Sequence, residues 1–225
     1  MLEKYLGTVT RWIETRLQGG RGADGESGQR KPQSPAKQRR LQVHHDTLTG
    51  LPRAELMEDR LDLAIALAAR SSCKVAVMSL TLDDFAGIAE SRGSHAADRL
   101  LQGVAHALES CLRNGDSIGC RDLGQGWFMV LLPALPRSDD AAVVAEKLRR
   151  GLESPVVVDG DETHVRCSIG IGVYPTDGAD AEAVIAAADA AMGQARRNGG
   201  NAYKFMTVPD TGAAYFRWPT GWAAQ

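Results

Sequence analysis

Paired cysteines and aromatic residues are scarce in this 225-residue sequence. Aromatic residues make up only 5% of it, and the four cysteines are far apart, with no CxxC pair and no histidine at metal-ligand spacing. This spacing argues against a disulfide-stapled fold and a structural zinc site. It predicts reduced thiols in a cytoplasmic protein. The cysteines are Cys73, Cys111, Cys120 and Cys167.

Long apolar runs and a strong net charge are also missing. No run approaches the roughly 20 apolar residues that cross a bilayer, and the opening "MLEKYLGTVTRW" has no signal-peptide centre. The net charge of -2 gives no general attraction to nucleic acid. We therefore expect no transmembrane segment and no nucleic-acid partner, and any anionic ligand must be held by a local cluster.

The two ends of the sequence differ from its middle. Residues 1–17 place apolar side chains on one face at helical spacing, which predicts an amphipathic helix that needs a partner surface. Residues 18–40 are rich in Gly, Ser, Pro and basic residues, which is typical of a flexible linker. Residues 207–225 form an aromatic tail that could pack on its own domain or on another protein. Both ends are candidates for self-association or for binding a protein partner.

The middle segment, residues 41–206, has the pattern of a compact domain. Apolar periodicity predicts alternating helices and strands, with a polar loop before the apolar run that starts at Trp127. This order predicts an α/β (α+β) fold in which helices cover an open sheet. The predicted elements are helices over 54–70, 96–112, 138–153 and 181–197, strands over 74–82 and 127–133, and a hairpin over 155–175 that turns at Asp159 and Gly160.

Two long motifs in this domain resemble a known family. The stretch "HHDTLTGLPRAELMEDRL" is similar to DxLTGLxNR, the opening of the GGDEF family of diguanylate cyclases. The stretch "CSIGIGVYPTDGADAEAVIAAADAAMGQARRNGGNAYKF" is similar to the family's closing run, SIGIxxYPxDGxDxxxLxxxADxAMYxAKxxGRNxYxF. The resemblance covers about residues 41–206. It implies a nucleotidyl-cyclase palm-like fold, with a mostly antiparallel sheet and a ferredoxin-like core flanked by helices.

The family's chemistry implies where metal ligands should stand. Its members condense two GTP molecules to cyclic di-GMP with divalent metals, which prefer carboxylate oxygens. The resemblance places one acid at the start of a DxDxF motif, which reads "TLDDF" here. Thr81 therefore stands at the metal-binding position, while Asp83 and Phe85 keep the other two.

The signature itself is also altered. Where the family has GGDEF, this sequence has "GQGWF", so Gly126 and Trp127 replace both acids. Neither a hydroxyl nor an indole carries the formal negative charge that a divalent ion needs, and Trp127 fills volume that the triphosphate would use. We expect no catalytic residue and no metal cofactor, with Mg²⁺ bound only if residual cyclase activity exists. A shifted register that makes Asp83 or Asp84 a ligand is the alternative. The degenerate signature comprises Gly124, Gln125, Gly126, Trp127 and Phe128.

Other family contacts to GTP are partly retained. The segment NDxxGHxxGD reads "AESRGSHAAD" here, which keeps Asp98 but places Ala89 at the Asn position. In the closing run Arg196 takes the place of the phosphate-binding Lys, and Gly200 that of a later Arg. Asp98 could instead be an acid favoured by a helix dipole, and Arg196 part of a solvated helix face. GTP is therefore a possible ligand.

A product-binding motif of the family is better preserved. Members carry RxxD upstream of the signature, and "RNGD" supplies Arg113 and Asp116 at that spacing. Arg offers a planar fork for guanine or phosphate, and Asp accepts from guanine nitrogens. Lys147 stands near a supporting cation of the family. The interval to Phe128 is longer than usual, and "RNGD" could also be a turn that ends a helix.

Three functional hypotheses follow. The first is a catalytically inactive GGDEF-type signalling module that binds cyclic di-GMP through its RxxD site. The second is a protein-interaction scaffold that needs no nucleotide. The third is a residual diguanylate cyclase.

Overall fold

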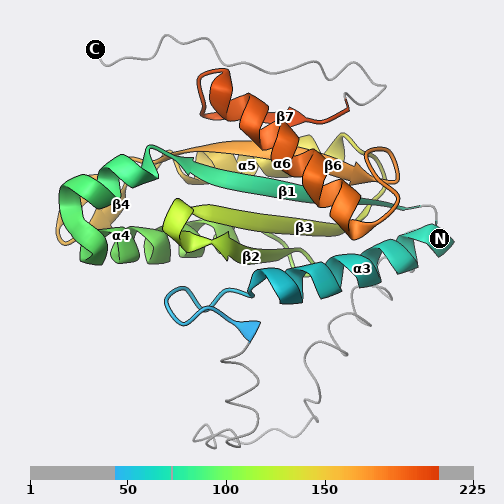
Figure 1. Ribbon diagram of the computed structural model, residues 1–225, viewed down its shortest axis with the longest axis horizontal. Coiled ribbons are helices and arrows are strands. Elements are labelled where there is room, and N and C mark those ends of the chain that lie inside the picture. Colours follow the sequence, from blue (N-terminus) through green and yellow to red (C-terminus); the bar gives the residue numbers. More distant parts are fainter. Residues whose placement is uncertain (1–43, 72, 208–225) are drawn as a thin grey trace, which may run out of the picture.

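The computed structural model describes residues 44–71 and 73–207 (Figure 1). The predicted helix of 1–17, the predicted linker of 18–40 and the predicted tail beyond residue 207 lie outside these residues. Within the described part of the chain, no helix combines the length and apolar character needed to cross a membrane.

A five-stranded sheet forms the centre of the fold, in the order β2-β3-β1-β6-β7. Neighbouring strands are antiparallel except β6 and β7, which are parallel. The mixed, mostly antiparallel sheet and its covering helices confirm the predicted fold class. The strands are β1 (Lys74–Asp83), β2 (Ser117–Asp122), β3 (Trp127–Leu135), β6 (Arg166–Tyr174) and β7 (Ala202–Phe205), and β4 (Val156–Val158) and β5 (Asp161–Thr163) pair as a separate hairpin.

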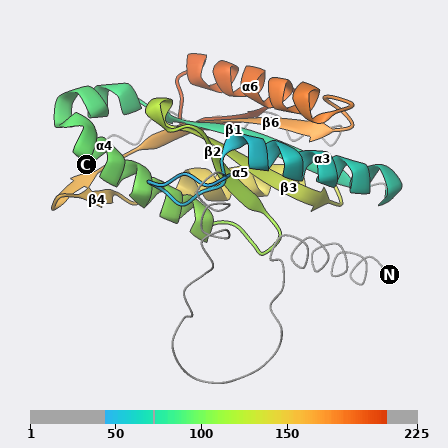
Figure 2. The ribbon, with the colours of Figure 1, turned by 60° about the horizontal axis from the view of Figure 1, so that its bottom comes forward.

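Four long helices cover the two faces of the sheet. In Figure 1, α6 (Ala181–Arg197) and α3 (Ala54–Ser71) lie in front of the sheet, with α4 (Phe85–Ser110) and α5 (Asp140–Gly151) behind it. Figure 2 shows the same arrangement after a turn about the horizontal axis. The sheet is therefore the middle of three layers, and its central strand β1 is buried on both sides.

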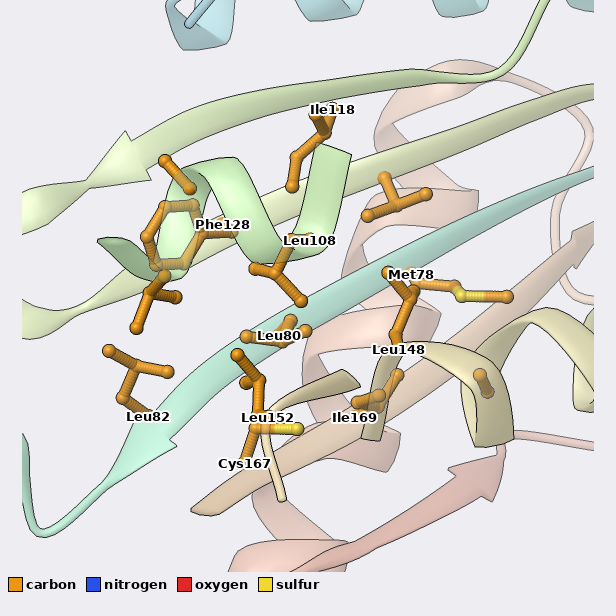
Figure 3. Close-up of a cluster of buried hydrophobic side chains, with 14 of the residues drawn as sticks. Met78, Leu80, Leu82, Leu108, Ile118, Phe128, Leu148, Leu152, Cys167 and Ile169 are labelled. Carbon is orange, nitrogen blue, oxygen red and sulfur yellow. The ribbon is translucent and has the colours of Figure 1, made fainter. Parts of the chain in front are cut away.

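Alternate residues of β1 supply the two cores. Val75 and Val77 point to the cluster that includes residues of α3 and α6. Met78, Leu80 and Leu82 point to the larger cluster, where Figure 3 shows them beside side chains of α4 and α5. A strand with period-2 side chains and helices on both faces must be apolar on both faces.

Close packing of α6 on β6 depends on two glycines. A Cβ at Gly170 would lie 2.0 Å from the carbonyl oxygen of Ala188 and 2.0 Å from the backbone nitrogen of Met192. A Cβ at Gly172 would lie 2.4 Å from the carbonyl oxygen of Val184. The "SIGIG" sequence therefore lets the helix backbone approach the strand.

Several element predictions are confirmed and others are wrong. The predicted helices of 54–70 and 181–197 and the strand of 74–82 agree with the structure within a residue. The helix predicted over 96–112 corresponds to the part of α4 after Gly93, whose backbone is not helical (φ 83°, ψ 170°), and the helical segment that begins at Phe85 was not predicted. The hairpin turns at Asp159 and Gly160 as predicted, but only β4 and β5 form it and β6 joins the main sheet.

Two strands escaped the sequence prediction. β2 lies within a stretch that was predicted to be a polar loop, and β7 was not predicted as a strand. Both are short edge strands, of 6 and 4 residues, so neither shows the apolar alternation of a half-buried strand.

Candidate functional site

The two altered metal positions lie side by side at one end of the sheet. Thr81 of β1 is paired directly with Trp127 of β3, and with Ser168 of β6 on its other side. Thr81 is 1% exposed, and its hydroxyl has no hydrogen-bond partner among the described residues. The structure therefore brings together the two positions that the family motifs place at the metal.

The altered signature forms a compact turn between β2 and β3. Asp122 accepts a hydrogen bond from the backbone nitrogen of Gln125 at 3.3 Å and caps a single 3-10 turn, η1 (Leu123–Gln125). Gly126 follows with φ 66°, and a Cβ there would come within 3.1 Å of the Phe85 ring. Gly124 and Gln125 lie in this turn. Just before the turn, the pairing of β2 with β3 shifts register between Cys120 and Asp122. The register shift and the turn together accommodate the extra residues between Asp116 and Phe128.

Phe128 and Phe85 belong to the core. Phe128 is 1% exposed and packs among the residues of Figure 3, and Phe85 at the start of α4 is 4% exposed. The aromatic residues that survive from the DxDxF and GGDEF motifs therefore have packing partners that account for them.

Asp83 is occupied by contacts within the fold. Its Oδ1 accepts a hydrogen bond from the Ser168 hydroxyl at 2.8 Å, and its Oδ2 accepts one from the backbone nitrogen of Asn201 at 2.8 Å. A Cβ at Gly200 would lie 2.7 Å from the same Oδ2. The neighbouring Asp84 is exposed and lies 3.3 Å from Arg166. Asp83 therefore fixes the turn before β7 to the end of β1.

The residues at this end do not fit a divalent metal ion. A buried hydroxyl and an indole lack the anionic oxygens that hard cations require. Across residues 44–71 and 73–207, no three His, Cys, Asp or Glu side chains gather where they could hold a metal. In the pairing of β1 with β3, Ala76 stands opposite Leu132 and Thr81 stands opposite Trp127. Thr81 rather than Asp83 is therefore the residue of β1 that pairs with the signature hairpin.

The two remaining candidates for GTP contacts lie on helix surfaces. Asp98 is exposed on α4 beyond the kink at Gly93, and Arg196 is exposed in the last turn of α6. Neither makes a hydrogen bond or an ion pair that accounts for it within the described residues. Their positions agree equally with ligand contacts and with solvated helix faces.

The "RNGD" stretch forms a closed turn after α4. The backbone nitrogen of Asp116 donates to the carbonyl oxygen of Arg113 at 3.1 Å, and Gly115 has φ 100°. Arg113 Nε lies 3.2 Å from Asp116 Oδ1, and Arg113 Nη2 donates to the carbonyl oxygen of Ala134 at 3.2 Å. The Arg113 side chain is 61% exposed and that of Asp116 only 2%. The turn thus presents the guanidinium and turns the carboxylate inward.

Charges around Asp116 act in opposite directions on its pKa. Burial of the carboxylate raises its pKa, and this is the largest effect. The charge and hydrogen bonds of Arg113, and then the charge of Lys147, oppose the increase. Lys147 is exposed on α5, and its carbonyl oxygen accepts from the Cys111 thiol at 3.6 Å. The structure therefore brings Arg113, Asp116 and Lys147 together at one corner.

A polar link near the signature was not foreseen. Arg121 Nη1 lies 2.5 Å from both carboxylate oxygens of Asp189 on α6, and the Ser79 hydroxyl lies 2.5 Å from Oδ1. These residues are more than 40 positions apart along the chain, so their pairing follows from tertiary packing. Two signals were available in the sequence: Ser79 within a mostly apolar strand, and Asp189 at the Asp of the ADxAM part of the closing run.

The comparisons with known proteins fit this geometry. Residues 43–202 match the family described as "Diguanylate cyclase, GGDEF domain". The chain belongs to the GGDEF family. Its relatives include the bifunctional diguanylate cyclase/cyclic di-GMP phosphodiesterase MucR of Pseudomonas aeruginosa, 38% identical over 162 residues that cover 72% of this chain and 23% of MucR. The cyclic di-GMP phosphodiesterase PdeR of Escherichia coli is 35% identical over 160 residues, which cover 71% of this chain and 23% of PdeR.

Solved structures show the same fold. The GGDEF domain of TpbB (YfiN) from Pseudomonas aeruginosa superposes with a TM-score of 0.70 at 29% identity, covering 73% of this chain and 95% of that one. The coiled coil and GGDEF domain of DgcB from Caulobacter crescentus, solved with cyclic di-GMP, gives a TM-score of 0.69 at 20% identity, covering 91% of this chain and 98% of that one. The GGDEF domain described here thus spans less than a quarter of MucR and PdeR but nearly all of the TpbB domain.

Proposed function

We propose that this GGDEF domain is a non-catalytic module of cyclic di-GMP signalling that binds cyclic di-GMP at the "RNGD" turn. The observation that carries the proposal is the pairing of Thr81 with Trp127. Membership of the GGDEF family relates the domain to cyclic di-GMP metabolism. The replacement of metal-binding acids by Thr81 and Trp127 supports a role in binding cyclic di-GMP over a role in synthesising it.

Charge balance at the signature end argues against cyclase chemistry. A triphosphate and its developing charge need divalent cations, and those need anionic ligands at fixed positions. Thr81 offers a neutral hydroxyl that is 1% exposed, and Trp127 offers a neutral ring. GTP could still bind weakly through Asp98 and Arg196, without the metal that activates the attacking hydroxyl.

The ligand-binding part of the proposal depends on Arg113. Its Nε and one Nη2 hydrogen are held by Asp116 and Ala134, so the outward edge of the guanidinium is positioned before a ligand arrives. A preorganised guanidinium can bind a guanine edge or a phosphate through two hydrogen bonds. Lys147 adds a second positive charge at the same corner. Because its side chain is nearly buried, Asp116 would act mainly by orienting the Arg113 guanidinium, until a ligand replaces Asp116 as the partner of Arg113.

A nucleotide-independent interaction module is the second candidate. The burial of Asp116 and its contacts to Arg113 favour this second candidate. The two residues already form hydrogen bonds and an ion pair with each other within the turn, without a ligand. The structure of the diguanylate cyclase SiaD with its activator SiaC, at 25% identity and a TM-score of 0.69, shows a protein partner for one similar chain. Residues 1–17 and 207–225 would supply the contacts here.

A turnover assay tests the non-catalytic part of the proposal. The purified protein with GTP and Mg²⁺ or Mn²⁺ should form no detectable cyclic di-GMP, whereas ordinary enzymes reach roughly one turnover per second or more. The double substitution Thr81→Asp with Trp127→Glu should add Mn²⁺-dependent binding of GTP without requiring turnover. Turnover by the unaltered protein near the ordinary rate would contradict the proposal.

A further inference from the structure

The signature hairpin, defined here as residues 117–135, is joined to two other elements by one carboxylate. Asp189 of α6 receives the Arg121 guanidinium on both oxygens and the Ser79 hydroxyl on Oδ1, each at 2.5 Å. Arg121 belongs to β2, Ser79 to β1 and Asp189 to α6. A single ion pair with one extra hydrogen bond therefore connects the hairpin, the central strand and a covering helix.

The sequence builds this link through two local irregularities. The register shift between Cys120 and Asp122 sets Arg121 outside the regular pairing of β2 with β3. On the other side, Ser79 pairs with Gly170, the glycine that allows α6 to approach the sheet closely. Asp189 follows Ala188, whose carbonyl oxygen makes that close approach. The link therefore depends on both the bulge and the glycine.

The Arg121–Asp189 pair is less exposed than a surface salt bridge. The Arg121 and Asp189 side chains are 27% and 32% exposed, and Ser79 is 3% exposed. Exposed ion pairs contribute little to stability. Removing one partner of a partly buried pair, in contrast, leaves a partly desolvated charge without compensation.

We propose that Arg121, Asp189 and Ser79 form a fastener that holds the signature hairpin in place without a metal ion. A divalent ion held by acids of β1 and β3 would also connect the hairpin to β1, but Thr81 and Trp127 do not provide those acids. The guanidinium is instead a cation that the chain carries itself. The surface of the hairpin, Trp127 included, then keeps one arrangement whether or not nucleotide and metal are present. This goes beyond the proposed function, because it concerns how the hairpin is held rather than what the domain binds.

A double-mutant cycle on the whole protein tests the fastener. Arg121→Gln and Asp189→Asn should each lower the thermal midpoint by about 4–8 °C, as expected for a partly buried pair in a protein of this size. The double variant should lose clearly less than the sum of the two, because the partners act as one unit. Hydrogen exchange of amides 122–128 should become at least about tenfold faster in each single variant.

The matched control is Arg137→Gln. Arg137 also pairs with an aspartate, Asp139 at 3.0 Å, but its side chain is 60% exposed. This control should shift the midpoint by less than about 2 °C. Arg121→Lys keeps a positive charge, so its thermal midpoint should lie closer to that of the wild type than to that of Arg121→Gln. This variant provides a measurement if the neutral variants aggregate.

Three outcomes would overturn the proposal. One is additive losses in the double variant, and another is losses no larger than that of Arg137→Gln. The third is a wild-type midpoint or hairpin exchange that changes with EDTA or with Mn²⁺, since a metal would then be fastening the hairpin. None of these measurements uses a nucleotide, so they fail or succeed independently of cyclic di-GMP binding.

Discussion

Asp83 shows how a residue can keep its place in a motif while serving the fold. Both of its oxygens accept hydrogen bonds, from Ser168 and from the backbone of Asn201. The turn that it anchors contains Gly200, with φ 69° and no room for a Cβ beside Asp83. In a sequence, a carboxylate that ligates a metal and one that caps a turn look the same.

Substitution of Gly200 tests this anchoring role. Gly200→Ala should destabilise the protein because it combines an unfavourable positive φ with displacement of Asp83. Gly199→Ala is the control, because Gly199 has φ 112° but nothing within 4 Å of a Cβ. We expect Gly199→Ala to cost about 1–3 kcal/mol and Gly200→Ala at least about 1 kcal/mol more. Denaturant titrations measure the free energy of unfolding of both variants. Equal losses of stability would mean that the contact with Asp83 does not contribute to stability.

A pH titration tests the burial of Asp116. Its pKa is raised above the ordinary 3.8, so the folded state binds the proton more readily than the unfolded state. The stability contribution of Asp116 is therefore fully present below the unfolded pKa and is lost as pH rises through the folded pKa. The thermal midpoint of the wild type relative to Asp116→Asn should fall over that window. A difference that stays constant or grows with pH would show that Asp116 is not desolvated.

Among the structural elements, α6 and β6 show the tightest backbone contact. Gly170→Ala would place a Cβ 2.0 Å from the backbone of α6, and the helix must move to accept it. We expect a loss of about 3 kcal/mol, at the upper end for overpacking. Gly87→Ala in α4 is the control, with nothing within 4 Å of its Cβ, and it should be neutral or stabilise by up to about 1 kcal/mol. Chemical denaturation of both variants checks this, and similar stabilities would contradict the close packing.

The sequence predicted the long elements better than the edges. Strand 74–82 and helix 181–197 carry strong periodicity, so their positions follow from local pattern. β2 and β7 are recognisable only through their pairing with β3 and β6. The kink at Gly93 was not foreseen either, because a glycine inside a helical pattern can end, bend or simply weaken a helix.

The candidate site divides in the same way. Motif alignment placed Thr81 and Trp127 at related positions, and the strand register brings them together. Spacing brought Arg113 near Asp116, but the burial of Asp116 depends on the rest of the fold packing around it. The link from Arg121 to Asp189 joins residues 68 positions apart, which no local pattern reveals.

At the scale of the whole molecule, the GGDEF fold is retained while its acidic signature is replaced. The fold places on one domain a signature end with Thr81 and Trp127 at the family's metal-binding positions and an exposed Arg113. This combination supports the proposed role of a receptor for cyclic di-GMP. Under that proposal the domain reports the presence of the dinucleotide without making it.

Calorimetric titration with cyclic di-GMP tests this central claim most directly. The wild type should bind, and Arg113→Ala should weaken binding by about ten- to a hundredfold, equivalent to about 1.5–3 kcal/mol. Arg113→Lys should not restore affinity, because a point charge cannot replace a two-pronged contact. Arg166→Ala, at an arginine that is 60% exposed and pairs with Asp84, should bind like the wild type. If the wild type binds cyclic di-GMP no better than Arg113→Ala, the "RNGD" stretch is only a turn and the receptor account is wrong.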